Sequence, residues 1–160
     1  MEGRYKEFSQ ELFRENDKTA RKFCKRYLPR ILKSIDPEKY NKVDIRDNED
    51  QFGPDLCCFI DNQLAGYFEP EIKHNWVNPI FPFNDLQIPE RKEKWVDGHN
   101  GKPVSFCVLS KPCTGVAIVR GKDMVDSPKE EISNRYNEEG ELFFKIPLNK
   151  VKFFDFLDYV

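Results

Sequence analysis

The chain has 160 residues, of which 39% are hydrophobic and 34% are charged, and its formal net charge is -2. This composition excludes an intrinsically disordered chain and suffices for one buried core, so we expect a single domain over residues 1–160. No apolar stretch has the length of a signal-peptide core or a membrane span. We therefore expect a soluble, intracellular (cytoplasmic) protein with no membrane partner, encoded by a cell or by a phage that replicates inside one.

The cysteines indicate a reducing compartment. There are five, which is an odd number, they form no Cys-x-x-Cys pair, and most lie in apolar runs. This pattern favours buried free thiols over a disulfide framework or a zinc site. The residues are Cys24, Cys57, Cys58, Cys107 and Cys113.

The first predicted element is helical. Between residues 20 and 35, apolar side chains recur at i, i+3, i+4 and i+7, which predicts an amphipathic helix capped by Asn16 or Asp17. Pro29 should kink this helix or begin a new one. A shorter helix is expected over residues 5–12, followed by Glu15 on the side of its apolar residues.

The polar face of the longer helix is strongly basic. Residues 17–33 contain seven basic side chains and one acidic side chain. Such a face either contacts phosphates or is an ordinary solvated helix surface, and the sequence supports both interpretations equally. Lys22 and Lys25 are the candidate nucleic-acid contacts on it.

A hairpin follows a short alternating strand at 42–46. Residues 55–60 and 64–72 predict two strands joined by a polar turn, because each run is apolar and the residues between them favour turns. This pairing places Asp55 opposite Glu71, or one residue away if the turn is tighter.

Three charged side chains share one face of the second strand, because side chains alternate along a strand. They are Glu69, Glu71 and Lys73. Of the two glutamates, Glu71 is the expected site residue. Pro70 cannot donate a ladder hydrogen bond, so we expect a sheet edge or a bulge there.

Two carboxylates and one amine at the hairpin predict a metal-assisted hydrolytic site. Mg²⁺ takes oxygen ligands, and Asp55, Glu71 and the Ile72 carbonyl offer them. Lys73 would orient or deprotonate a water, or stabilise the pentacovalent phosphate. A Glu-x-Lys pattern alone is weak, because residues 90–92 repeat it in what is otherwise a solvated segment.

The C-terminal half predicts further strands. Residues 77–85 are rich in proline and indicate a loop. Residues 86–95 include Arg91 and Lys92, which either contact a phosphate backbone or belong to an ordinary surface segment. Short apolar runs predict buried central strands. The runs are 104–109 and 115–119, with a late strand at 141–146 and a C-terminal strand or tail at 151–156.

Gly53-Pro54-Asp55 together with Glu71-Ile72-Lys73 resembles the signature of the PD-(D/E)XK nucleases. The resemblance covers about residues 15–110 and implies an α/β, restriction-endonuclease-like fold with a mixed central sheet flanked by helices. It implies that Asp55 and Glu71 bind Mg²⁺, with Mn²⁺ as a substitute, and that Lys73 assists the attacking water. It also implies a further carboxylate ligand from an N-terminal helix, for which Glu15 is the candidate and Glu11 the alternative.

A tryptophan three residues after Lys73 is similar to the pattern in small phage junction-resolving endonucleases. The resemblance implies a metal-dependent endonuclease that hydrolyses DNA, with branched DNA such as a Holliday junction as the leading substrate. A homodimer is expected, because cutting two strands needs two sites. The alternatives are a nicking or single-strand nuclease, and an inactive nuclease fold that only binds nucleic acid or protein.

Overall fold

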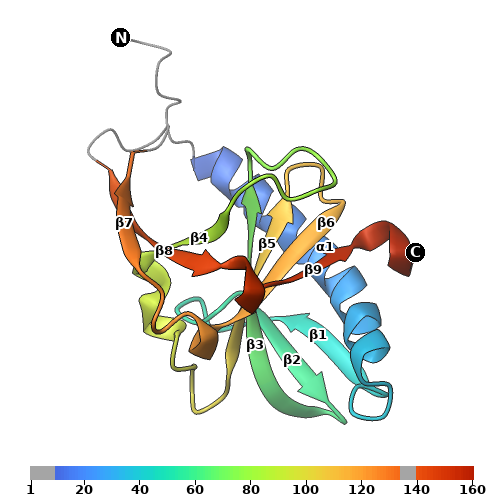
Figure 1. Ribbon diagram of the computed structural model, residues 1–160. Helices are drawn as coiled ribbons and strands as arrows, with labels where there is room; N and C mark the ends of the chain where they lie inside the picture. Colours follow the sequence, from blue (N-terminus) through green and yellow to red (C-terminus); the bar gives the residue numbers. More distant parts are fainter. Residues whose placement is uncertain (1–9, 134–139) are drawn as a thin grey trace.

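The structure is a computed structural model that describes residues 10–133 and 140–160, with side chains of the first helix described from residue 15 onwards. Within these ranges the chain is α/β, with one α-helix, α1, and nine strands in two sheets (Figure 1). The larger sheet is mixed, as predicted. No helix in the described part of the chain is long and apolar enough to cross a membrane.

Helix α1 (Gln10–Ile35) begins six residues before Asn16, so the predicted caps are wrong. The helix also continues through Pro29. Its apolar stripe packs on the sheet, and this burial outweighs the one backbone hydrogen bond that proline removes. Of the shorter helix predicted over residues 5–12, the part before Gln10 lies outside the described residues, and the remainder belongs to α1.

The central sheet has six strands in the order β1-β2-β3-β5-β6-β9. All neighbours are antiparallel except β3 and β5, which are parallel and are joined by a long crossover that contains β4. The strands are β1 (Val43–Asp47), β2 (Leu56–Ile60), β3 (Gln63–Lys73), β5 (Val104–Ser110), β6 (Gly115–Arg120) and β9 (Lys152–Asp155).

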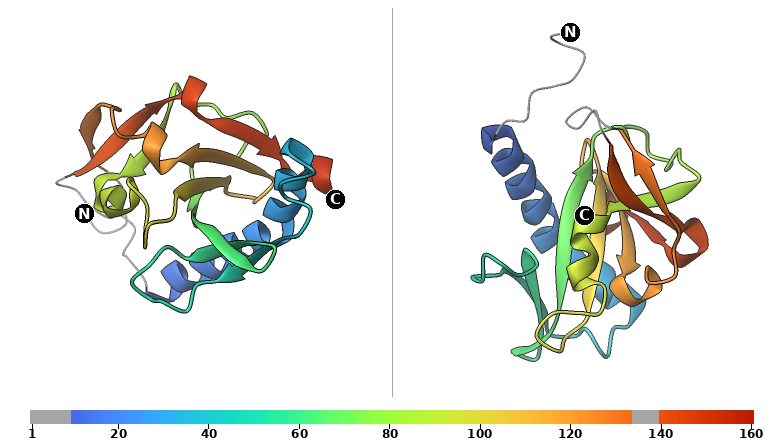
Figure 2. Two further views of the ribbon diagram at one scale, coloured as in Figure 1. Left: turned by 90° about the horizontal axis from the view of Figure 1, so that it is seen from below. Right: turned by 90° about the vertical axis from the view of Figure 1, so that its left-hand side faces the viewer.

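A second sheet covers the face of the central sheet opposite α1 (Figure 2). Its order is β4-β8-β7, and a 3₁₀ helix, η1 (Glu90–Trp95), follows β4. Of the flanking helices expected around the mixed sheet, the described residues contain one α-helix, α1, which covers one face. The strands are β4 (Asp85–Pro89), β8 (Glu141–Pro147) and β7 (Lys129–Ile132).

Two apolar cores share the central sheet, because side chains alternate along its strands. In β5, Phe106 and Val108 pack toward the small sheet, whereas Cys107 and Leu109 pack toward α1. All five cysteines are buried and free, as predicted. Strand β5 is thus covered on both sides, as its continuous apolar run predicts.

The hairpin of β2 and β3 differs from the predicted register. Its turn has only two residues, Asp61 and Asn62, with φ of 52° and 64°, the left-handed conformation of a tight hairpin turn. One irregularity follows, between Cys58 and Phe59, and the last pair is Leu56 with Phe68. The residue before β2 therefore comes opposite Glu69, and the prediction that Asp55 faces Glu71 is wrong by two residues.

Candidate functional site

The candidate site lies where β3 extends past the start of β2. Beyond Phe68, β3 is paired only with β5, so one side of its backbone is open. Pro70 lies in this open part, which fits the predicted local sheet edge. The Asp55 backbone N–H donates to Oε1 of Glu69 at 2.9 Å, and this contact brings the end of the Gly-Pro-Asp segment against β3.

Helix α1 brings a second carboxyl group to this place. The side chains of Asp17 and Asp55 share a hydrogen bond, and Asp17 Oδ2 lies 3.5 Å from Nη2 of Arg21. Burial, the Asp17 hydrogen bond and the charge of Glu69 raise the pKa of Asp55 to about 8. Without a cation, Asp55 therefore holds a proton at neutral pH.

The two glutamates of β3 share one buried lysine. Nζ of Lys92, in η1, lies 3.0 Å from Oε2 of Glu71 and 3.3 Å from Oε2 of Glu69. Burial disfavours the charge on Lys92, but Glu71 and Glu69 outweigh it and hold the pKa of the amine above its usual range. Burial raises the pKa of Glu69, against the opposing effects of Lys92 and the Asp55 N–H.

Lys73 ends β3 in a partly apolar setting. Its Nζ lies 4.7 Å from the centroid of the Phe83 ring. Burial lowers the pKa of Lys73, and the charges of Glu71 and Asp85 oppose this effect only in part. A lowered pKa is the change that allows a lysine to exchange a proton with water near neutral pH.

An acidic side chain of α1 reaches Asp55, but it is neither of the two glutamates named from the sequence. Glu15 is exposed, the side chain of Glu11 lies outside the described residues, and Asp17 reaches Asp55 instead. The periodicity of α1 contains the missed signal, because Asp17 precedes the buried Ala20 and Cys24 by three and seven residues. Asp17 thus lies on the stripe that faces the sheet, and Glu15 does not.

The predicted nucleic-acid contacts divide into exposed and buried side chains. Lys22 is exposed, Lys25 pairs with Asp47 at 2.8 Å, and Arg91 pairs with Glu141. Lys92 is buried and paired with Glu69 and Glu71, an arrangement that does not offer its amine to a phosphate at the surface. Residues of η1 alternate between the core and solvent, so Arg91 is exposed whereas the next residue, Lys92, is buried.

The segment after Lys73 ties the site to α1 and to the core. Nδ2 of Asn16 lies 3.2 Å from Nε2 of His74, which joins the helix to the end of β3. Trp76 is buried in the core under the small sheet, with 2% of its surface exposed, and Ile72 packs against the core under α1. The Trp that carries part of the family resemblance is therefore a packing residue in this fold.

The acids around Asp55 and on β3 do not form a preassembled metal site in the described part of the chain. In residues 10–133 and 140–160, no three Asp, Glu, His or Cys side chains gather closely enough to hold a metal ion. The acids form two pairs instead, Asp17 with Asp55 and Glu69 with Glu71. Mg²⁺ usually keeps several waters and needs only one or two carboxylates besides a substrate phosphate. The contact of Asp17 with Asp55 brings carboxyl oxygens together, and such oxygens are the ligands that a hard cation takes.

In comparisons with known proteins, no family model matches the chain, and neither a curated protein nor a solved structure matches it. The functional argument therefore rests on the chemistry and geometry of the residues described above.

Proposed function

We propose that this protein is a Mg²⁺-dependent endonuclease that hydrolyses phosphodiester bonds in DNA, with Mn²⁺ able to replace Mg²⁺. The supporting observation is the contact of Asp17 with Asp55, whose backbone N–H binds Glu69 on the strand that ends at Lys73. Acidic oxygens are ligands for Mg²⁺, and an amine of lowered pKa can take a proton from an attacking water.

Asp17 and Asp55 would bind the cation, which would replace the proton of this pair. Glu71 and the Ile72 carbonyl remain the candidate metal ligands from β3. When bound, a divalent cation polarises the phosphoryl group and lowers the pKa of an attacking water. Asp17 takes the role that the sequence assigned to Glu15.

The two lysines have different roles in this proposal. Lys73 would orient the attacking water or take its proton. Its lowered pKa favours the neutral amine that can accept a proton. Lys92 would hold Glu69 and Glu71 in place, because it contacts both carboxylates while buried. We therefore describe Lys92 as a positioning residue.

The basic face of α1 supports a nucleic-acid substrate. Asp17 contacts the site from α1. Lys18 and Lys22, which follow Asp17 closely in the sequence, are exposed to solvent. Phosphate contacts beside a metal site would guide a DNA strand toward the acids. Branched DNA is the leading substrate, and a homodimer would supply a site for each strand.

A cleavage assay tests the proposal. Wild type should cut at least one of linear duplex, single-stranded or four-way-junction DNA with Mg²⁺ or Mn²⁺ and none with EDTA. Asp55→Asn and Lys73→Met should each reduce the rate about 100-fold or more, in line with the loss of a ligand or a proton-transfer group. Asp126→Asn and Lys150→Met, at exposed positions elsewhere, are the matched controls and should retain wild-type rates.

Absence of metal-dependent cleavage by folded wild type would refute the enzyme proposal. Unchanged cleavage by Asp55→Asn and Lys73→Met would refute the site assignment. Glu15→Gln provides a further comparison with Asp17→Asn: only the Asp17 substitution should reduce the rate.

A second candidate is a nuclease-like fold that binds nucleic acid without cutting it. The salt bridges of Lys92 favour it, because they already neutralise Glu69 and Glu71 without a metal. Metal-independent binding of DNA by wild type, together with the absence of cleavage in every metal tested, would support this candidate.

A further inference from the structure

The loop between η1 and β5 contains a tight turn that presents His99. The backbones of His99 and Lys102 bond twice, because each N–H donates to the carbonyl of the other residue at 2.9 Å. Asn100 and Gly101 between them have φ of 51° and 74°, the left-handed conformation of a two-residue hairpin turn. Gly98 precedes the turn with φ of 106°, and a Cβ there would lie 2.5 Å from the Lys102 carbonyl oxygen. The backbone of this turn therefore fixes where the His99 side chain begins.

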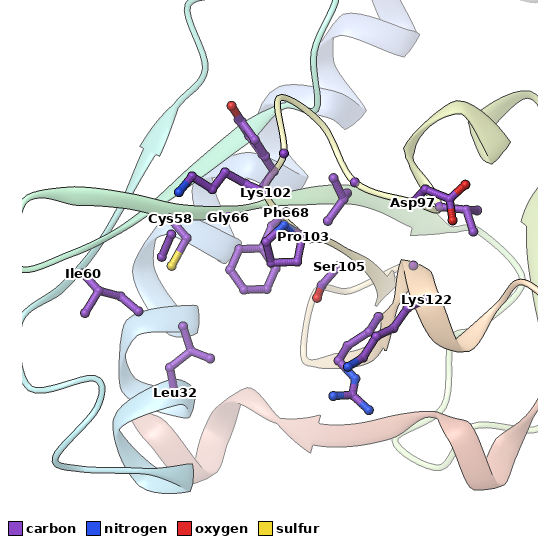
Figure 3. A pocket seen from close by; sticks show the side chains of 18 of the residues that line it. Leu32, Cys58, Ile60, Gly66, Phe68, Asp97, Lys102, Pro103, Ser105 and Lys122 are labelled. Carbon is purple, nitrogen blue, oxygen red and sulfur yellow. The ribbon is translucent and has the colours of Figure 1, made fainter.

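The turn is anchored on β3. The Tyr67 N–H donates to the Pro103 carbonyl at 2.9 Å. Gly66 lies directly against the same carbonyl, since a Cβ on it would be 2.9 Å from the oxygen (Figure 3). The His99 ring packs edge-on against the Tyr67 ring, with the two centroids 5.1 Å apart. The imidazole is therefore held in place relative to the central sheet.

His99 faces the loop over residues 48–55, which precedes β2. Its Nε2 is buried, lies 3.5 Å from Oδ2 of Asp50, and makes no hydrogen bond with the described residues. A Cβ on Gly53 would lie 2.9 Å from this Nε2 and 2.7 Å from Nδ2 of Asn48, closer than real Cβ contacts come. Gly53 therefore fits between His99 and Asn48 because it has no side chain.

The same loop positions Asp55. The Asn48 N–H donates to the Asp55 carbonyl at 2.9 Å, and Nδ2 of Asn48 donates to the Pro54 carbonyl at 2.9 Å. Asp55 contacts α1 through its side chain and β3 through its backbone N–H. A shift of Asn48 or Gly53 would therefore move the carboxyl group that joins the helix to the sheet.

We propose that His99 is a positioning residue of the candidate site: its imidazole supports the loop at Gly53 and thereby holds Asp55 against Asp17 and Glu69. His99 acts through Gly53 and not by touching the substrate. Its effect on catalysis rests on the proposed nuclease function, whereas its effect on the place of Asp55 does not. A residue that only stabilised the fold would affect amides throughout the core alike, and this difference separates the two roles.

Hydrogen exchange of the full chain tests the positioning without reference to cleavage. In His99→Ala, the Asp55 amide, which donates to Glu69, should exchange about tenfold or more faster than in wild type, because the loop loses its support. The amide of Ala117, in β6 between β5 and β9, should change little. Lys102→Ala, exposed in the same turn, is the matched control and should leave both rates unchanged. Equal acceleration at Asp55 and Ala117, or no acceleration at Asp55, overturns the proposal.

Steady-state cleavage tests the catalytic consequence. His99→Ala should lower kcat about tenfold or more and change KM less than about threefold, because a misplaced Asp55 impairs the chemical step more than it impairs strand binding. His99→Gln is the milder variant and should recover part of kcat, since its amide nitrogen can replace Nε2 beside Gly53. A wild-type kcat in His99→Ala overturns the proposal. Absence of cleavage by wild type refutes the proposed function alone, and the exchange rates then decide the role of His99.

Discussion

Lys92 and Asp55 are ionisable side chains that the fold has largely removed from water, and each reaches a different charge state. Lys92 remains a cation because two carboxylates contact it. Burial and the acidic neighbours Asp17 and Glu69 raise the pKa of Asp55, and the charge of Arg21 opposes them only in part. At the residue scale, the charge of the neighbouring groups therefore decides whether a buried ionisable side chain becomes neutral or stays charged in an ion pair.

Replacing Lys92 by methionine should destabilise the protein by about 3–5 kcal/mol at pH 7, because Glu69 and Glu71 would be left as unpaired neighbouring acids. Urea unfolding measures the change in the free energy of unfolding. Lys94→Met, an exposed lysine of the same 3₁₀ helix, should change it by less than about 0.5 kcal/mol. A loss at Lys92 no larger than the loss at Lys94 would contradict the buried pairing.

Asp55 should make stability depend on pH in metal-free buffer with EDTA. Its pKa is raised from 3.8 to about 8, so between these values the folded state binds more protons than the unfolded state. The stabilising contribution is complete below pH 4 and is lost as pH rises to 8, at roughly 1 kcal/mol or less per pH unit after solvent screening.

Asp55→Asn removes the titration, so the difference between wild type and this variant isolates it. The free energy of unfolding of the variant relative to wild type should rise between pH 5 and pH 9. A difference that stays constant over this range would show that Asp55 does not hold its proton in the folded protein.

At the element scale, tertiary packing overrides local preferences in α1. Pro29 lies in the interior of a 26-residue helix, although it cannot donate to the carbonyl of Lys25. The buried stripe of this helix, from Ala20 through Leu28 to Ile31, continues across the proline without a change of phase. The apolar surface buried by that stripe is large enough to retain the helix.

Pro29→Ala should therefore stabilise the protein by about 1–2 kcal/mol, after allowance for the more flexible unfolded chain. Chemical denaturation measures the change, and the helical signal in circular dichroism should not fall. Lys33→Ala, exposed in the last turn of α1, is the matched control and should change stability by less than about 0.5 kcal/mol. A destabilised Pro29 variant would indicate that the proline ring contributes packing that alanine loses.

At the scale of the whole molecule, the central sheet belongs to both cores. Phe144 and Ile146 of β8 pack with Val104 and Phe106 of the central sheet, while α1 packs on the other face. Because the same strands complete both cores, loss of one core should remove support from the other.

Phe144→Ala should lower stability by about 3–5 kcal/mol, because the side chain is 2% exposed and leaves a cavity. Tryptophan fluorescence reports on the core under the small sheet, since Trp76 and Trp95 both lie there, and far-ultraviolet circular dichroism reports mainly on α1. The two signals should shift together to the same lower midpoint. Separate midpoints would show two independently folding units, and Leu142→Ala, exposed in the same strand, should have little effect.

The sequence by itself predicted the elements whose signal is local. The apolar phase of residues 20–35, the two hairpin strands, the buried strands at 104–109 and 115–119, and the buried thiols all follow from periodicity or residue type. The segment at 86–95 and the strand at 129–132 carry weaker local signals. The strands that form there, β4 and β7, both pair with β8, which lies far from β4 in the chain but close to β7.

Only the tertiary structure decided which charged groups meet. Asp17 joins Asp55 across 38 residues, and Lys92 joins Glu69 and Glu71 across about 20. A two-residue turn and one bulge also moved the position opposite Asp55 from Glu71 to Glu69. Periodicity specifies which face of an element is buried, but a contact between distant elements depends on how those faces pack, and no local pattern contains that information.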